Sequence, residues 1–183
     1  MSKILVLSGH PDYKTSVANR AILDQFSRLV PDAEIVSLGD LYPNFEIDVK
    51  REQERILQAD VVVMEFPIWW YSSPSLMHRY VEQVFTHGFA YGSQGKQLQG
   101  KRLILSFTSG APSSAYSPEG YQFFTIDSLM PPFFAMANLT GMQWGGYVYS
   151  GSMMCIDPTD KAKLATIIAA ANDHAARLAE KVK

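Results

Sequence analysis

Three consecutive aromatic residues, Trp69, Trp70 and Tyr71, follow shortly after an apolar run at residues 60–64. The run is typical of a buried strand, expected over residues 60–66, and loops at the carboxyl ends of parallel strands are where α/β proteins bind ligands. A row of flat, polarisable side chains in such a loop favours a planar aromatic ligand. Taken alone, an aromatic cluster more commonly packs in a core or a dimer interface, so the neighbouring loops must distinguish the two interpretations.

The loop after the first apolar run, residues 9–19, has the composition of an anion site. It lacks the glycine patterns that hold a dinucleotide pyrophosphate or form a P-loop. Thr15 and Ser16 lie at the expected start of a helix, where free backbone N–H groups and the helix dipole favour negative charge. Asn19 offers a further donor. Helix capping alone would also explain the two hydroxyl groups.

A third loop, residues 108–116, is small and rich in hydroxyl groups. Its glycine, Gly110, lets the backbone approach a ligand closely. In a doubly wound sheet the three loops meet where the strand order reverses. Together they would supply a phosphate seat, an aromatic wall and polar contacts to a ring edge. That combination suits flavin mononucleotide (FMN), and we expect such a site here.

Short apolar runs alternate with helical patterns along the chain, and these predict the strands and helices that position the three loops. This order implies right-handed crossovers, and it predicts an α/β protein with a flavodoxin-like doubly wound five-stranded parallel sheet and helices on both faces. No repeat, linker or low-complexity tract interrupts the chain, so residues 1–183 are expected to form a single domain. The expected strands are residues 3–8, 33–38, 60–66, 102–107 and 143–149, and the expected helices are 16–29, 48–58, 75–85, 126–139 and 158–182.

Two adjacent prolines interrupt one of these helices. Pro131 and Pro132 stand near the beginning of the segment 126–139. Because proline is unfavourable inside a helix and favourable at its first turn, this segment predicts two helical pieces or a helix that begins at the prolines.

The composition excludes several classes of protein. The 183 residues are 47% hydrophobic and carry a net charge of −2, which provides no field for nucleic acid or anionic lipid. A single cysteine, Cys155, excludes an internal disulfide and fits a reducing compartment. The apolar start of the chain is too short for a signal peptide, and no window approaches about 18 apolar residues. We therefore expect a cytoplasmic protein without a nucleic-acid partner.

Other reactive side chains indicate no second site. His78, His87 and His174 lack the spacing of a metal motif, so no metal is expected and a surface or hydrogen-bonded role is favoured. Glu52 and Glu54 lie in a charged helical pattern and are expected to be solvated. Cys155 is expected to be a small apolar residue after the last strand. Five methionines are expected to be packing residues: Met130, Met136, Met142, Met153 and Met154.

Five segments carry a resemblance that spans nearly the whole chain. With them the sequence resembles the flavodoxin-like NAD(P)H:quinone oxidoreductase family, and within it the bacterial ancillary flavoproteins of glutathione-gated potassium efflux systems. The segments are Gly-His-Pro at 9–11, Leu-Tyr-Pro-Asn-Phe-Glu-Ile-Asp at 41–48, Phe-Pro-Ile-Trp-Trp-Tyr-Ser-Ser-Pro at 66–74, Val-Phe-Thr-His-Gly-Phe-Ala-Tyr-Gly at 84–92 and Thr-Ser-Gly at 108–110.

The resemblance implies a role for each part of the predicted site. The flavin carries out the hydride chemistry, and the protein positions it and tunes its electrostatics. The cofactor-binding residues implied are His10, Ser16, Val17, Ala18 and Asn19 for the phosphate and ribityl chain, Pro67, Ile68, Trp69, Trp70 and Tyr71 for the isoalloxazine ring, and Thr108, Ser109, Gly110 and Ala111 for its pyrimidine edge.

Three positions depart from the family pattern. Trp69 stands where Gln is common, and Ala111 adds a methyl group where the backbone is expected to pass close to the ring. The family places a Tyr and, six residues later, a His beside the flavin; Tyr116 matches the Tyr, but Gln122 replaces the His. Because Gln cannot take up a proton, Tyr116 and water are left to balance charge in this catalytic corner. Flavin binding is therefore better supported than quinone turnover.

A homodimer is implied as well, because in the family the partner subunit completes the flavin cleft. The chain also offers more aromatic surface than one small sheet domain is expected to bury. The residues concerned are Tyr91, Phe123, Phe124, Phe133 and Phe134.

The function implied is an oxidoreductase that takes hydride from NADH or NADPH and passes two electrons to a quinone or similar acceptor by ping-pong chemistry. FMN is expected rather than FAD, because no extra segment for an adenosine moiety follows the last helix. One alternative is a regulatory subunit that binds a potassium-efflux protein at the inner membrane and has secondary reductase activity. The other is an electron-transfer flavodoxin, which is disfavoured because those proteins use a different phosphate loop and a more acidic surface.

Overall fold

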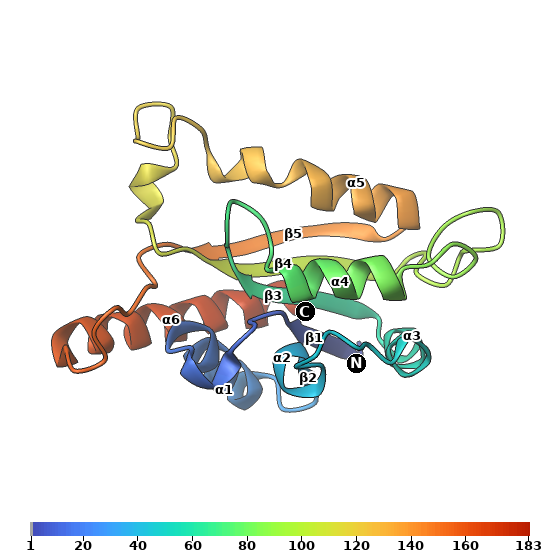
Figure 1. Cartoon of the computed structure of the whole chain (residues 1–183), viewed down its shortest axis with the longest axis horizontal. Helices are drawn as coiled ribbons and strands as arrows, with labels where there is room; N and C mark the ends of the chain where they lie inside the picture. The colour runs from blue at the N-terminus through green and yellow to red at the C-terminus, as the bar shows by residue number, and fades with distance from the viewer. Residues whose placement is uncertain (1) are drawn as a thin grey trace.

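A computed structural model describes residues 2–183 of the chain. At its centre is a five-stranded sheet in which every pair of neighbouring strands is parallel (Figure 1). The strand order β2-β1-β3-β4-β5 reverses between β1 and β3, which confirms the predicted flavodoxin-like doubly wound sheet. The strands are β1 (Ile4–Ser8), β2 (Glu34–Ser37), β3 (Val61–Pro67), β4 (Arg102–Thr108) and β5 (Gln143–Ser150).

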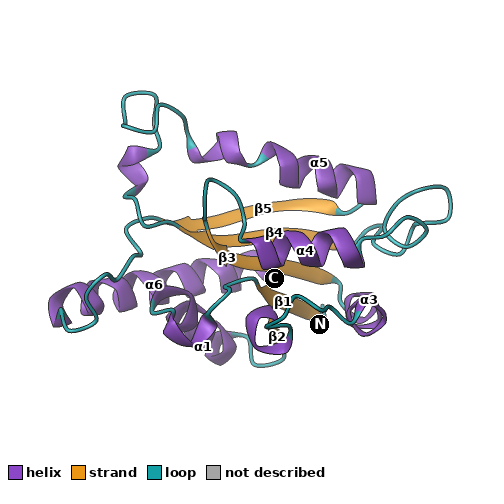
Figure 2. Cartoon of the chain, viewed as in Figure 1, coloured by secondary structure: helices purple, strands orange, loops and turns teal. Residues whose placement is uncertain are grey.

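Helices cover both faces of the sheet (Figure 2). Helices α1 and α6 pack on one face, and α3, α4 and α5 pack on the other. Within residues 2–183, no helix combines the length and the apolar character needed to cross a membrane. The helices are α1 (Ala18–Leu29), α2 (Leu38–Leu41), α3 (Val49–Gln58), α4 (Ser75–Val84), α5 (Pro131–Thr140) and α6 (Lys161–Val182).

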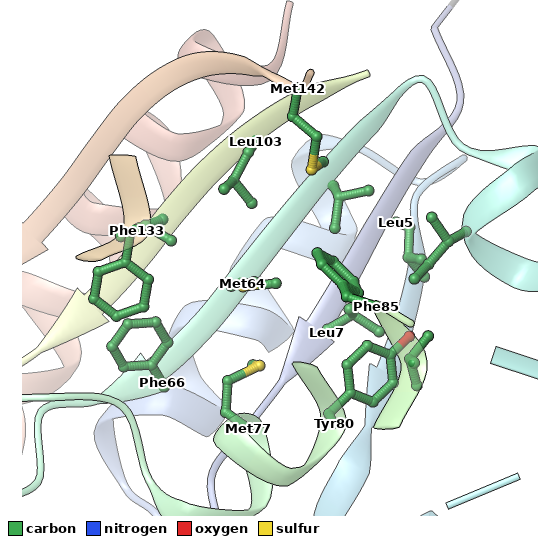
Figure 3. Packing of buried hydrophobic residues seen from close by; sticks show 14 of the residues in the cluster. Leu5, Leu7, Met64, Phe66, Met77, Tyr80, Phe85, Leu103, Phe133 and Met142 are labelled. Carbon is green, nitrogen blue, oxygen red and sulfur yellow. The ribbon is translucent and has the colours of Figure 1, made fainter. Parts of the chain in front are cut away.

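The central strands separate two hydrophobic cores because successive side chains point to opposite faces. Val63 packs toward α1 and α6, whereas Met64 and Phe66 pack toward α4 and α5 (Figure 3). The Phe66 ring stacks on Phe133 of α5 with 5.7 Å between ring centroids. The expectation that Phe133 belongs to an exposed aromatic surface is therefore wrong, since this residue joins α5 to the sheet.

Several boundaries differ from the predicted ones. The first helix begins at Ala18 rather than residue 16, because residues 13–15 form a 3-10 turn and Ser16 is extended. The short helix α2 follows β2 directly where a loop was expected, and the Ser37 hydroxyl accepts the Asp40 N–H at its start. The last helix begins at Lys161 rather than residue 158, where Asp160 caps it by accepting the Lys163 N–H at 2.9 Å.

The paired prolines act as predicted. Residues 126–129 form a separate 3-10 turn, and α5 begins at Pro131 with proline at its first positions. The helix ends at Gly141, whose φ of +70° is the left-handed conformation that favours glycine. This arrangement holds α5 along β5 on the face opposite α6 (Figure 1).

Glu52 and His174 are among the fully buried polar side chains. Glu52 of α3 accepts hydrogen bonds from the phenols of Tyr42 and Tyr80 and pairs with Arg55, so the expectation of a solvated Glu52 is wrong. Glu54, two residues along the helix, is exposed as expected. The imidazole of His174 lies 2.9 Å from a serine hydroxyl on each side, which confirms the predicted hydrogen-bonded role, and burial lowers its pKa to about 3.

Candidate functional site

A hollow of about 220 Å³ opens at the carboxyl edge of the sheet, where the strand order reverses. The loops after β1, β3 and β4 meet there, together with the loop after β5. Twelve of its lining residues come from the first three loops and the adjoining ends of α1, β3 and β4: His10, Thr15, Ser16, Val17, Ala18, Asn19, Pro67, Ile68, Trp69, Thr108, Ser109 and Gly110. The structure therefore brings the three loops singled out in the sequence to one place.

The start of α1 forms one end of the hollow and presents backbone donors. The Ser16 hydroxyl accepts the Asn19 N–H at 3.2 Å, so the cap interpretation of this serine is confirmed. Among the described residues, the N–H groups of Val17 and Ala18 donate no hydrogen bond. Free N–H groups at a helix start attract an anion, and both residues line the hollow.

Asn19 places a further donor in the same wall. Its side chain is only 2% exposed, and its Oδ1 accepts the Thr108 hydroxyl at 2.9 Å. Its Nδ2 has no hydrogen-bond partner among the described residues. A buried donor without a partner is costly, so an acceptor from a ligand in the hollow would satisfy it.

His10 lines the hollow next to the aromatic wall. Its Nδ1 accepts the Asp12 N–H at 3.1 Å, so in the neutral ring the proton lies on Nε2. Burial lowers the pKa of His10, although Asp12 partly offsets this. The ring meets Trp69 edge to face, with 6.2 Å between centroids. The missing side chain of Gly39 lets this loop pass close to it, because a Cβ there would lie 2.7 Å from the His10 carbonyl oxygen.

The aromatic wall is a tight turn at the end of β3. Backbone hydrogen bonds between Trp69 and Ser72 close the turn, and Trp70 and Tyr71 adopt positive φ angles of 49° and 66°. Non-glycine residues rarely adopt this conformation, and such strain concentrates at ligand sites. Trp69 lines the hollow, whereas Trp70 and Tyr71 lie outside it. All three are exposed, Trp70 by 93%, so the alternative of a core role is wrong.

The loop after β4 closes the other side. Ser109 is buried and Gly110 is exposed, and both line the hollow. Ala111 lies outside it, and its carbonyl oxygen accepts hydrogen bonds from the Ser109 hydroxyl at 2.8 Å and from the Ser152 N–H at 2.9 Å. The loop is thus tied to the segment after β5.

The expected catalytic corner lies beside the hollow and not in its lining. The Tyr116 ring contacts Phe124 and Tyr149, each with 6.1 Å between centroids. Burial raises the pKa of Tyr116, and the nearby Ser109 hydroxyl partly offsets this. Gln122 is half-buried, and its backbone N–H donates to the Ala115 carbonyl at 3.2 Å. Ser109 therefore connects the hollow to this corner.

Comparison with known proteins agrees with this fold. Residues 2–175 match a family model described as a flavodoxin-like fold. The chain belongs to this flavodoxin-like family. It is 40% identical over 142 residues to an uncharacterized NAD(P)H oxidoreductase, YrkL, of Bacillus subtilis (strain 168), a match that covers 78% of this chain and 81% of YrkL.

Two further flavodoxin-like relatives cover more of the chain. The glutathione-regulated potassium-efflux system ancillary protein KefF of Enterobacter sp. (strain 638) is 36% identical over 161 residues, which are 87% of this chain and 90% of KefF. The crystal structure of general stress protein 14 from Treponema denticola, in complex with FMN, superposes with a TM-score of 0.87 at 27% identity and covers 98% of this chain and 99% of that one.

This flavodoxin-like site includes residues that the sequence did not single out. Met153, Met154 and Cys155, from the loop after β5, complete the lining of the hollow. Met153 is buried as expected, but Met154 is exposed. A Cβ added to Gly110 would lie 2.6 Å from the methyl carbon of Met154. Met154 is therefore not a core residue, although its side chain packs against Gly110. Their position at the carboxyl end of a strand was the signal that could have found them.

A buried acid lies beneath the same edge of the flavodoxin-like sheet. Glu65 of β3 is fully buried, its Oε2 accepts the Ser8 hydroxyl at 2.8 Å, and its Oε1 has no partner among the described residues. No ion pair forms with it in that part of the chain. Burial raises the pKa of Glu65 to about 8, and the bond from Ser8 offsets only part of this. Within residues 2–183, no group of three His, Cys, Asp or Glu side chains is arranged to hold a metal ion.

Proposed function

We propose that this protein binds FMN and acts as an NAD(P)H oxidoreductase that delivers two electrons to a quinone or a similar acceptor. The observation that carries the proposal is the unpartnered Nδ2 of Asn19 in a hollow that free helix N–H groups and an aromatic turn also border. The likeness to an NAD(P)H oxidoreductase and to an FMN complex supports the same assignment.

The first loop would hold the phosphate of the cofactor. Val17 and Ala18 would donate their N–H groups, and Asn19 would add its amide. None of these donors carries a permanent positive charge, so the helix dipole and hydrogen bonds would supply the affinity. The Nε2–H of neutral His10 would be a further donor, since Asp12 holds its proton on that side.

The second and third loops would hold the ring. Pro67, Ile68 and Trp69 offer an apolar wall, with Trp70 and Tyr71 beyond the hollow on the same turn. On the other side, the N–H groups of Gly110 and Ala111 donate no hydrogen bond among the described residues. Such donors at the pyrimidine edge would stabilise the negative charge of the reduced flavin and thus favour its two-electron reduction.

FMN, when bound, accepts a hydride from NADH or NADPH and passes two electrons on to an acceptor. A ping-pong order would follow, because one open face beside Trp69 and Tyr71 would receive the nicotinamide and then the quinone. The proton balance at this face would fall to Tyr116 and water. Gln122 cannot titrate where the family has histidine.

The open face also supports a homodimer. A hollow of about 220 Å³ is smaller than the roughly 300–1,000 Å³ that ligand pockets usually offer, so one chain does not enclose a whole FMN. Next to it are exposed aromatic residues, including Phe123 at 80% exposure, and a ring contact between Tyr71 and Phe124 joins the two aromatic segments. A second copy seated on this surface would complete the cleft.

FAD is a second candidate for the cofactor. Another hollow, of about 340 Å³, shares Thr15, Ser16 and Val17 with the first and continues along Arg20 to Ile168 of α6. An AMP moiety attached to the flavin phosphate would enter this space, with Arg20 beside its charge.

The test is the identity of the bound cofactor. The purified protein should be yellow, and the mass of the released flavin distinguishes FMN from FAD. In Asn19→Asp the Thr108 contact is retained, but a carboxylate replaces the free donor; flavin affinity should fall at least about tenfold, because like charges in contact cost several kcal/mol. Asn138→Asp, an exposed change on α5, is the matched control. A colourless protein that neither flavin reconstitutes would reject the proposal.

The likeness to KefF favours a second candidate function, a regulatory subunit of a potassium-efflux system at the inner membrane. Potassium flux through a co-expressed efflux protein distinguishes the two. If Asn19→Asp abolishes reductase activity but retains stimulation of flux, regulation is the primary role. If this protein has no effect on flux, the reductase role stands alone.

A further inference from the structure

The hydroxyl group of Ser109 is held by a phenol from another strand. Tyr149 Oη of β5 lies 2.7 Å from Ser109 Oγ, and Ser109 donates its own proton to the Ala111 carbonyl at 2.8 Å. Because a serine hydroxyl has a single proton, Tyr149 must be the donor in the first of these bonds. The three groups form a directional chain from Tyr149 through Ser109 to Ala111.

Tyr149 is itself held in place from two faces of the sheet. Its ring packs on Phe107 with 5.3 Å between centroids and meets Tyr116 edge to face at 6.1 Å. On the opposite face, Arg177 of α6 donates to the Tyr149 carbonyl at 3.2 Å and to the hydroxyl of Ser150 at 2.8 Å. A donor anchored in this way can determine the direction of the hydroxyl that it contacts.

We propose that Tyr149 is a positioning residue of the cofactor site, which acts through Ser109 on the ring-edge loop and supports the ring of Tyr116. The proposal rests on the function proposed above. With the Ser109 hydroxyl turned toward Ala111, the loop is fixed in the form that leaves the N–H groups of Gly110 and Ala111 facing no protein acceptor. These are the donors available to a flavin edge.

Tyr149→Phe removes the phenol and retains the ring. FMN affinity should fall about three- to tenfold, the effect of one hydrogen bond, and the midpoint potential of the bound flavin should become more negative. Tyr147→Phe is the matched control: this ring also lies 5.3 Å from Phe107, but its phenol donates to Asp127 at the surface. A merely structural role would lower the melting temperature while leaving the potential of the folded protein unchanged.

A double-mutant cycle tests the route through Ser109. In the Ser109→Ala background, Tyr149→Phe should weaken FMN binding no further, since its hydrogen-bond partner is gone. An equal loss of affinity in both backgrounds would overturn the proposal, as would equal FMN affinities and potentials in Tyr149→Phe and Tyr147→Phe.

Amide exchange of the flavin-free protein separates this proposal from the cofactor assignment. Tyr149→Phe should raise exchange in residues 108–116 above that of Tyr147→Phe, because the loop loses its anchor. If the wild-type protein binds no flavin, the proposed function is rejected and no cofactor site is left for Tyr149 to position. Unchanged exchange overturns the role of Tyr149 even where FMN binds.

Discussion

Replacing the buried acid of β3 should change how the stability of the protein depends on pH. Glu65 has an ordinary pKa of 4.5, and burial raises its pKa in the folded protein to about 8. The unfolded chain releases its proton near the ordinary value, whereas the folded chain retains it. The folded state therefore binds more protons between these values, and its stability falls as pH rises from about 4.5 to 8.

The size of the effect follows from the two pKa values. The interval from 4.5 to about 8 corresponds to roughly 5 kcal/mol, at about 1.4 kcal/mol per pH unit. Between pH 5 and pH 8 the contribution amounts to about 3–4 kcal/mol. In Glu65→Gln the group no longer titrates, and the amide can still accept the Ser8 hydroxyl. At pH 5 the variant should be about 1–3 kcal/mol less stable than wild type, because its amide nitrogen is buried without an acceptor.

Urea unfolding of the flavin-free proteins at several pH values between about 5 and 8 measures this difference. The stability of Glu65→Gln minus that of wild type should rise by about 3 kcal/mol across the range. His10 and His174, whose pKa values burial lowers, stabilise the fold as pH rises toward their ordinary values, but they cancel in the comparison. Glu54→Gln, an exposed change on α3, is the matched control. A difference between Glu65→Gln and wild type that stays constant from about pH 5 to 8 would mean that Glu65 is ionised in the folded protein across this range.

Three further predictions concern the cofactor site. Ser16→Glu should weaken FMN binding several-fold or more in a fluorescence titration, because it puts a carboxylate beside the phosphate, while acidic residues at a helix start are tolerated in folding; unchanged affinity would remove Ser16 from the site. Trp70→Ala should change the free energy of unfolding by no more than about 0.5 kcal/mol, since the side chain is exposed. It should weaken dimer formation in sedimentation experiments and FMN binding in titrations. A large loss of stability would contradict the exposed position of the Trp70 side chain. The rate of flavin reduction by NAD(P)H should vary little between about pH 6 and 8 in stopped-flow measurements, and Gln122→His should make this rate depend on pH. Tyr116→Phe should slow the reaction about tenfold. An inflection of the wild-type rate near pH ~6.5 that survives replacement of His10 would show that another group titrates.

The order of strands and helices could be predicted from the sequence because it depends on local patterns. Continuous apolar runs such as residues 61–64 mark strands buried on both faces, and helical spacing between them implies parallel crossovers. The same logic placed the loops after β1, β3 and β4 at one edge, which explains why most residues expected at the site line one hollow. The starts of two helices could be predicted as well, because Pro131 occupies the first position of α5 and the Asp48 side chain caps α3.

Burial and neighbourhood depend on contacts between distant segments, and only the tertiary structure decided them. Glu52 looked solvated within its charged helix, but two tyrosines and an arginine enclose it. Met154 and Cys155 joined the hollow because β5 ends beside β4, and Trp70 turned outward because its turn adopts a left-handed backbone. Among the described residues, fully buried Glu65 has one hydrogen-bond donor, an environment that no pattern of neighbouring residues encodes. The sequence by itself determined which loops meet; long-range packing determined which atoms in them are left without partners.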